Sequence, residues 1–203
     1  MSFKTEQEAF WAGEFGDDYI ARNTAQRLLP SKTVMWAQIL RPAHSVSSVV
    51  EFGCNIGVNL QALYNLKPTL DLAGIEINAT AAETARALGV ADITEGSILE
   101  PVAREQVDLT FTSGVLIHID PESLTAVYDN LVRTTRRYVV VSEYYNPSPV
   151  MIDYRGHQNR LFKRDFAGDL MDGYGLRLVD YGFIYKRDNW APQDDVTWFL
   201  LEK

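Results

Sequence analysis

Residues 49–63 read VVEFGCNIGVNLQAL, and this stretch predicts the architecture of the chain. The apolar, β-branched start is typical of a strand buried on both faces, and the run after Gly57 is typical of a helix. Gly53 and Gly57 form the turn between them, so a ligand is expected at the carboxyl end of the strand. Glu51 precedes the turn. Two unit charges about 4 Å apart interact by roughly 4 kcal/mol at an effective dielectric constant near 20, so Glu51 would repel a diphosphate and attract a cation.

A dinucleotide-binding turn is the main alternative for this segment. That turn has the pattern G-x-G-x-x-G, which lets a pyrophosphate sit on the helix N-terminus. Positions 53, 55 and 58 are Gly, Asn and Val here, so the middle glycine is missing. Three alternatives stay open at this point: an NAD(P)-dependent oxidoreductase, a non-catalytic module that binds the ligand without turnover, and a domain whose turn glycines serve only the backbone.

The composition indicates one globular domain with an acidic surface. The chain has 203 residues, of which 46% are hydrophobic, and its formal net charge is −8. A negative field disfavours nucleic acid as a partner. The single cysteine, Cys54, excludes an internal disulfide and fits a reducing compartment. No segment has the layout of a signal peptide or the length of a membrane span, so we expect a cytoplasmic protein without a membrane partner. Nothing in the sequence sets an oligomeric state.

Strands and helices alternate along most of the chain. Strands are expected at residues 48–53, 72–76, 91–96, 107–114 and 138–144, and helices at 58–66, 79–88, 120–132 and 165–171. Residues 177–187 and 196–203 are two further strands joined by a segment too short for a parallel crossover, so they should be antiparallel. The predicted fold is α/β: a doubly wound, Rossmann-like sheet of seven strands, mostly parallel, with an antiparallel C-terminal strand.

The N-terminal part is predicted to be a helical cap. Residues 4–29 are typical of two short helices, broken near Gly13 and Gly16 and ending before Pro30, and another helix is expected from residue 33. We expect one domain over 1–203, with a cap at 1–45 and a core at 46–203. An acceptor-side insertion is expected at about 144–166.

The segment E-F-G-C-N-I-G at 51–57 resembles the first motif, E/D-x-G-x-x-x-G, of class I S-adenosylmethionine-dependent methyltransferases. The resemblance implies S-adenosyl-L-methionine as cofactor and S-adenosyl-L-homocysteine as product. The donor carries an ammonium and a sulfonium, which suit an acidic turn. Glu76 matches the acid that bonds the ribose hydroxyls, and a carboxylate can accept from both hydroxyls of a cis-diol. The cofactor-binding residues implied or expected are Tyr19, Arg22, Glu51, Gly53, Cys54, Asn55, Gly57, Glu76, Ile77, Gly96, Ser97, Ile98, Ser113, Gly114 and Val115.

A narrower resemblance covers nearly the whole chain. The stretches TEQEAFWAGEFGDDYIARN, GVLIHIDPESL and FKRDFAGDLMD resemble the methylases found with pseudaminic acid biosynthesis genes. This resemblance implies a sugar, a nucleotide-sugar or a similar small acceptor, methylated on oxygen or nitrogen in surface-glycan or related biosynthesis.

His118 and Glu143 are the candidate catalytic residues. Methyl transfer needs alignment of the reacting atoms above all, and a base is needed only if the nucleophile must lose a proton. His118 follows the fourth strand on the acceptor side, and imidazole titrates in a suitable range. Its alternative role is packing or capping in a loop. Glu143 ends the fifth strand and is a second base candidate.

The acceptor is predicted to be anionic. Residues 151–166 read MIDYRGHQNRLFKRDF, a basic segment in an acidic chain, and arginine forks match carboxylate or phosphate groups. A solvated basic loop is the alternative. In the N-terminal helices, Arg22 and Tyr19 are predicted to contact the donor's carboxylate. No spacing of His, Cys, Asp and Glu indicates a metal site. The predicted substrate-binding residues are Tyr144, Tyr145, Tyr154, Arg155, His157, Arg160 and Lys163.

Overall fold

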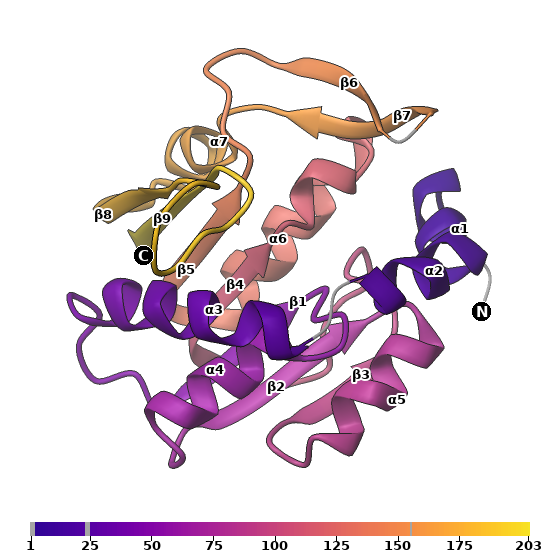
Figure 1. Cartoon of the computed structure of the whole chain (residues 1–203). Helices are drawn as coiled ribbons and strands as arrows, with labels where there is room; N and C mark the ends of the chain where they lie inside the picture. The colour runs from indigo at the N-terminus through magenta and orange to yellow at the C-terminus, as the bar shows by residue number, and fades with distance from the viewer. Residues whose placement is uncertain (1–2, 23–24, 155) are drawn as a thin grey trace.

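A computed structural model describes residues 3–22, 25–154 and 156–203. In this part of the chain a seven-stranded sheet has the order β3-β2-β1-β4-β5-β9-β8 (Figure 1). The five strands from β3 to β5 are parallel, and β9 is antiparallel to both β5 and β8. This is the predicted mixed sheet, with the last strand reversed. The strands are β1 (Ser48–Phe52), β2 (Asp71–Glu76), β3 (Asp92–Glu95), β4 (Val107–Ser113), β5 (Thr135–Glu143), β8 (Arg177–Ile184) and β9 (Val196–Glu202).

Helices cover both faces of the sheet and bury alternate residues of each strand. Val49 of β1 lies in a core cluster with α3 (Ala25–Leu40), α4 (Val58–Leu66) and α5 (Ala79–Ala87). Its neighbours Val50 and Phe52 lie in a second cluster with α6 (Leu124–Thr134) and α7 (Phe166–Tyr174). Successive side chains of a strand point to opposite faces, so Glu51 shares the face of Val49 and points toward α3 and α4.

The N-terminal helices differ from the prediction in two places. The chain breaks at Gly13, between α1 (Glu6–Ala12) and α2 (Glu14–Arg22), but Gly16 lies inside α2, so the second predicted break is wrong. The expected stop before Pro30 is also wrong, because α3 runs through it. A proline inside a helix removes one hydrogen bond and costs about 3 kcal/mol. The fully buried side chains of α3, Met35, Trp36 and Ile39, anchor the helix on the core, and we attribute its continuity to this packing.

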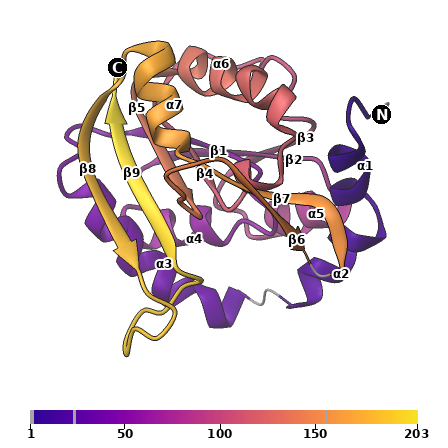
Figure 2. The same cartoon turned by 90° about the horizontal axis from the view of Figure 1, so that it is seen from above.

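The predicted insertion is an antiparallel hairpin of β6 (Val150–Tyr154) and β7 (His157–Lys163), which was not expected as strands. It reaches from the side of β5 across the carboxyl ends of the sheet toward α1 and α2 (Figure 2). The 3-10 turn η1 (Leu116–His118) contacts β7. A second 3-10 turn, η2 (Pro121–Ser123), takes the first turn of the helix expected at 120–132. No helix in the described ranges is long and apolar enough to cross a membrane.

Candidate active site

A cavity of about 750 Å³ opens at the carboxyl ends of β1, β2, β4 and β5. The strand ends and the turns that follow them line one side. Residues of α1, α2 and α3, together with the loop that follows β8, line the other. This is the crevice in which open α/β sheets bind their ligands. The predicted residues that line it are Tyr19, Glu51, Gly53, Cys54, Asn55, Glu76, Ile77, Gly96, Ser97, Ile98, Ser113, Gly114, Val115, His118, Glu143 and Tyr144.

The glycine turn needs its glycines for space as well as for backbone conformation. Gly53 has φ +76°, and a Cβ there would lie 2.7 Å from a methyl group of Val115. Gly57 has φ +79° and is the N-cap of α4, where it does not line the cavity. Cys54 is buried against Gly74, and burial raises the pKa of its thiol well above the usual range. The thiol of Cys54 therefore serves packing, as a small apolar group.

Glu51 is a buried acid with one oxygen left without a partner. Its side chain is 1% exposed, and Oε1 accepts a hydrogen bond from Asn59 Nδ2 at 2.7 Å. The indole of Trp36 donates to Asn59 Oδ1 at 3.2 Å, which fixes the orientation of the amide. Oε2 lacks a hydrogen-bond partner within the described part of the chain. Burial raises the pKa of Glu51 to about 8. A buried, unpaired carboxylate oxygen at a cavity wall is a ready acceptor for a cationic ligand.

Lys32 of α3 enters the same cavity, and the sequence analysis missed it. Its ammonium donates to Ser113 Oγ at 3.0 Å, at the end of β4. Burial lowers the pKa of Lys32, whereas the nearby charges of Glu51 and Glu143 raise it. The only local signal was a lysine within a largely apolar helix, which gives no indication of what the helix packs against.

Glu76 ends β2 with both oxygens held by backbone N–H groups. Oε2 accepts from the Asn55 amide at 2.7 Å and Oε1 from the Asn78 amide at 2.8 Å. Asn55 has φ +47°, a left-handed conformation that belongs to the same turn as this contact. Burial raises the pKa of Glu76, and these bonds oppose the shift. Each oxygen keeps a further lone pair, so this rigidly held carboxylate could accept from two hydroxyl groups of a ligand.

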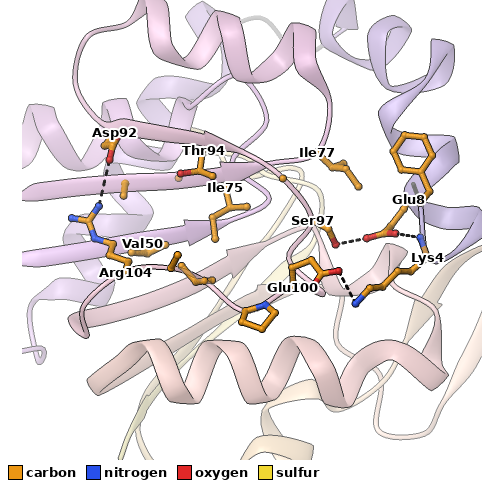
Figure 3. A pocket seen from close by; sticks show the side chains of 17 residues that line it. Lys4, Glu8, Val50, Ile75, Ile77, Asp92, Thr94, Ser97, Glu100 and Arg104 are labelled. Carbon is orange, nitrogen blue, oxygen red and sulfur yellow. Dashed lines mark hydrogen bonds and ion pairs between the residues drawn. The ribbon is translucent and has the colours of Figure 1, made fainter. Parts of the chain in front are cut away.

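The turn after β3 is closed by the N-terminal helix. Ser97 Oγ donates to Glu8 of α1, and Glu8 also accepts from the Lys4 amide at 2.5 Å. Figure 3 shows this contact in the wall of a second cavity, about 410 Å³ in volume, with an apolar floor that includes Val50 and Ile75. Glu8, Ile77, Gly96 and Ser97 line both cavities. The role of Glu8 could not be predicted from the sequence, because the contact joins residues 89 positions apart.

His118 lies between the cap and the hairpin. Its Nδ1 is 2.7 Å from the backbone oxygen of Arg160, and its ring packs against Trp11 at 4.5 Å and Tyr154 at 5.0 Å between ring centroids. Burial lowers the pKa of His118 to about 4. A carbonyl oxygen only accepts, so Nδ1 carries the proton and Nε2 of the neutral ring keeps its lone pair. A histidine in this state, at a cavity wall, could accept a proton.

Glu143 is buried at the end of β5, with 2% of its surface exposed. Oε1 accepts from the amides of Val115 at 3.1 Å and Leu116 at 3.2 Å, so this acid holds the turn after β4. Oε2 has no hydrogen-bond partner among the residues that the structure describes. Burial raises the pKa of Glu143 to about 7. The structure brings both predicted catalytic side chains to the one cavity.

Several predicted acceptor residues lie outside the cavity lining. Arg160 places its guanidinium 5.0 Å above the Phe10 ring and 3.4 Å from Glu6, so it joins the hairpin to α1. Lys163 lies 5.0 Å above the ring of Tyr144, which lines the cavity. Tyr145 is 42% exposed and lies near Phe199. Tyr154 contacts His118 and Phe15.

Three predictions fall on parts that are not described: Arg155, and the side chains of Arg22 and His157. Tyr19 lines the cavity beside Trp11, with ring centroids 5.2 Å apart. Among the described His, Cys, Asp and Glu residues no group of three could hold a metal ion.

The fold is shared with solved methyltransferases of low sequence identity. The Burkholderia thailandensis 1,6-didemethyltoxoflavin-N1-methyltransferase, with bound 1,6-didemethyltoxoflavin and S-adenosylhomocysteine, gives a TM-score of 0.76 at 12% identity over 100% of this chain and 91% of that one. Magnesium protoporphyrin IX methyltransferase from Synechocystis PCC 6803, with bound S-adenosylhomocysteine, gives 0.71 at 14% identity over 99% and 100%. The glycopeptide N-methyltransferase MtfA gives 0.67 at 11% identity over 86% and 95%. No curated protein matches the sequence.

These likenesses establish a class I methyltransferase fold, as the sequence predicted. Residues 50–140, which run from β1 into β5, also match the family model described as a methyltransferase domain. The chain therefore contains a region that matches a methyltransferase domain, within the fold of S-adenosylmethionine-dependent methyltransferases. The predicted enzyme class and cofactor are confirmed at this level, and the match favours them over the oxidoreductase alternative.

Proposed function

We propose that the protein transfers the methyl group of S-adenosylmethionine to an oxygen or nitrogen atom of a small, anionic acceptor, such as a sugar acid or a nucleotide-sugar. The observation that carries the proposal is Glu51, whose buried Oε2 lacks a partner in the described chain and lines the cavity. A cationic donor would supply the missing partner and favour the ionised form of Glu51, whereas the diphosphate of a nicotinamide dinucleotide would oppose its ionisation.

The donor is expected to lie along the turns after β1, β2 and β4. In this arrangement its ammonium binds Glu51 and its ribose hydroxyls bind Glu76, which the Asn55 and Asn78 amides hold in place. The adenine lies at the turn of Ser97 and Ile98. The methyl group then faces the end of β4 near Ser113, where the cavity extends toward His118.

The reaction is a single in-line displacement. The acceptor atom forms a bond to the methyl carbon while the carbon–sulfur bond breaks, and sulfur keeps the electron pair to give S-adenosylhomocysteine. Alignment and exclusion of water supply most of the acceleration. If the nucleophile is an alcohol or an amine, Nε2 of His118 takes its proton, because Nδ1 is already committed to Arg160. Glu143, whose pKa is raised to about 7, is the second base candidate.

An anionic acceptor is supported by the cations around the cavity. Arg27 and Lys186 line it at exposed positions, and Lys163 lies against Tyr144. The solved neighbour with bound 1,6-didemethyltoxoflavin shows that this fold can take a small acceptor. The resemblance to methylases associated with pseudaminic acid biosynthesis is the reason for proposing a sugar as the acceptor. That narrower assignment stays a prediction, as does the acceptor's charge.

The first test is ligand binding by calorimetry. We expect S-adenosylhomocysteine to bind and NADH not to bind, and binding of NADH alone would overturn the proposal. Glu51→Gln should weaken S-adenosylhomocysteine binding about 10- to 100-fold, as expected for loss of a charged hydrogen bond. The exposed Glu95→Gln serves as a matched control and should bind like the wild type.

The second test is transfer of a labelled methyl group to a panel of acceptors. The panel pairs each sugar acid and nucleotide-sugar with its neutral parent sugar. Transfer to the charged member and little to its parent supports an anionic acceptor. Preference for the neutral member would remove that part of the proposal. Donor binding with no transfer to any member or to fractionated extract would favour a non-catalytic module.

A further inference from the structure

The amino-acid end of the donor carries two opposite charges on one carbon, an ammonium and a carboxylate. Glu51 is suited to the ammonium. The carboxylate needs a cation inside the same part of the cavity, because an unpaired buried carboxylate is strongly disfavoured. The sequence predicted Arg22 and Tyr19 for this contact, and the side chain of Arg22 lies outside the described residues.

Lys32 is the cation that the cavity offers at this point. Within the described residues the lysine and arginine side chains that line the cavity are Arg27, Lys32 and Lys186. Arg27 and Lys186 are exposed, and Lys186 forms an ion pair with Asp195 at 3.1 Å. Lys32 is partly buried, and its ammonium donates to Ser113 Oγ at 3.0 Å. Ser113 takes one of its three donors, and within the described residues the other two remain for a ligand.

The charges around Lys32 fit the donor. Glu51, Glu143 and Asp194, which also line the cavity, are the charges that act on the Lys32 ammonium. S-adenosylmethionine carries two positive groups and one negative group. The positive groups suit the carboxyl groups of Glu51 and Glu143, and Lys32 is the cation with which the donor's carboxylate can pair.

We propose that Lys32 is a donor-binding residue that pairs with the carboxylate of S-adenosylmethionine, next to the contact between Glu51 and the ammonium. This assignment rests on the proposed function, since it concerns the same cavity and the same donor. It makes α3 a part of the donor site and assigns the carboxylate to a residue other than Arg22. The amino-acid end of the donor then lies next to α3.

A ligand series separates the two contacts. S-adenosylhomocysteine carries both charges, its decarboxylated analogue keeps only the ammonium, and 5′-methylthioadenosine has neither. For Lys32→Met we expect affinity for S-adenosylhomocysteine to fall about 10- to 100-fold, and affinity for the other two ligands to change less than threefold. For Glu51→Gln we expect losses with the first two ligands and none with 5′-methylthioadenosine. Lys67→Met, at an exposed lysine, is the matched control and should bind all three like the wild type.

The results of this ligand series distinguish a failure of the Lys32 pairing from a failure of the proposed function. Equal weakening of all three ligands by Lys32→Met would overturn the pairing and make Lys32 a structural residue. No change with S-adenosylhomocysteine would also overturn it. If Lys32→Met does not fold, the wild type and Lys32→Arg provide the test: wild type should prefer S-adenosylhomocysteine to its decarboxylated analogue, Lys32→Arg should keep most of that preference, and absence of any preference in the wild type would refute the pairing. A wild type that binds none of the three ligands would refute the proposed function instead.

Discussion

The ring of His118 and the backbone oxygen of Arg160 lie 2.7 Å apart, across a sequence separation of 42 residues. This bond ties the turn after β4 to the β6–β7 hairpin, and Trp11 of α1 packs its tilted ring against the same imidazole. One imidazole at the cavity wall therefore joins the turn after β4, the hairpin and the N-terminal helix. This contact places the ring proton of His118 on Nδ1, so the lone pair of Nε2 stays available to accept a proton.

His118→Gln should lower the turnover number at least tenfold for an alcohol or amine acceptor, while S-adenosylhomocysteine binding stays within threefold of the wild type. The glutamine amide can still donate to the Arg160 carbonyl but is a very weak base. Single-turnover kinetics with saturating donor measures the effect. The exposed His44→Ala is the control and should retain full activity. Unchanged turnover in His118→Gln would leave His118 a structural residue and turn attention to Glu143.

The same histidine should make the fold sensitive to acid. The pKa of His118 falls from about 6.5 in the unfolded chain to about 4 in the folded one because the ring is buried. Between these values the unfolded chain binds a proton that the folded chain does not, so stability is full above pH 6.5 and is lost as pH falls toward 4. The shift corresponds to about 3 kcal/mol. Urea unfolding at several pH values should show a smaller loss over this range in His118→Gln, and an identical loss would contradict the assignment.

Donor affinity should rise with pH. The pKa of Glu51 is raised to about 8 by burial, so much of the free protein carries a protonated Glu51 at neutral pH. The donor's ammonium favours the ionised form, so binding releases a proton, and affinity increases as pH rises from 6 to 8. Calorimetry in buffers of different ionisation enthalpy measures this release. Donor binding to Glu51→Gln should release fewer protons. Any remaining release comes from other groups, such as Glu143. Equal proton release in both proteins would show that Glu51 does not contact the donor.

Gly53→Ala should destabilise the protein more than Gly89→Ala. Both glycines have positive φ, +76° and +67°, so an alanine at either position costs about 1–2 kcal/mol of backbone strain. A Cβ at position 53 would also meet Val115 at 2.7 Å, whereas one at position 89 meets nothing within 4 Å. Comparison of the two free energies of unfolding isolates the clash. Equal losses would mean that Val115 moves aside freely. Gly53→Ala should also weaken donor binding, which Gly89→Ala should leave intact.

The residues at the strand ends could be predicted from the sequence because their positions depend on local order. Glu76 ends β2 and Glu51 lies one residue before the end of β1, and parallel neighbouring strands bring their carboxyl ends to one edge. That rule needs no knowledge of how helices pack. The reversed β9 was predictable for a similar reason, since a short connection excludes a parallel crossover. These elements placed most of the predicted donor residues in one cavity.

Lys32 and Glu8 were not predictable because they reach the cavity from helices that precede the sheet in the chain. Their positions depend on how α1 and α3 pack across the strand ends, and no local pattern reports that packing. The break expected at Pro30 failed for the same reason, since the core contacts of α3 outweigh a local preference. The basic residues of the hairpin show the converse case. Arg160 was predicted to bind an anionic acceptor, whereas the described structure has it against Phe10 and Glu6 of the cap.

The contact between Glu8 and Ser97 should couple the N-terminal helix to the donor site. Ser97 Oγ donates to Glu8, which is buried, so Ser97→Ala removes this hydrogen bond and Glu8→Gln removes the charge of its acceptor. Each variant should lower the free energy of unfolding by about 1–3 kcal/mol. In the double variant the losses should fall short of their sum by about 1 kcal/mol, because both changes act on the same bond. The exposed Glu14→Gln is the control for charge loss in this helical region. Strictly additive losses would show that the two side chains do not interact. Proteolysis within α1 should speed up in Glu8→Gln, and bound S-adenosylhomocysteine should slow it again if the donor holds the cap in place.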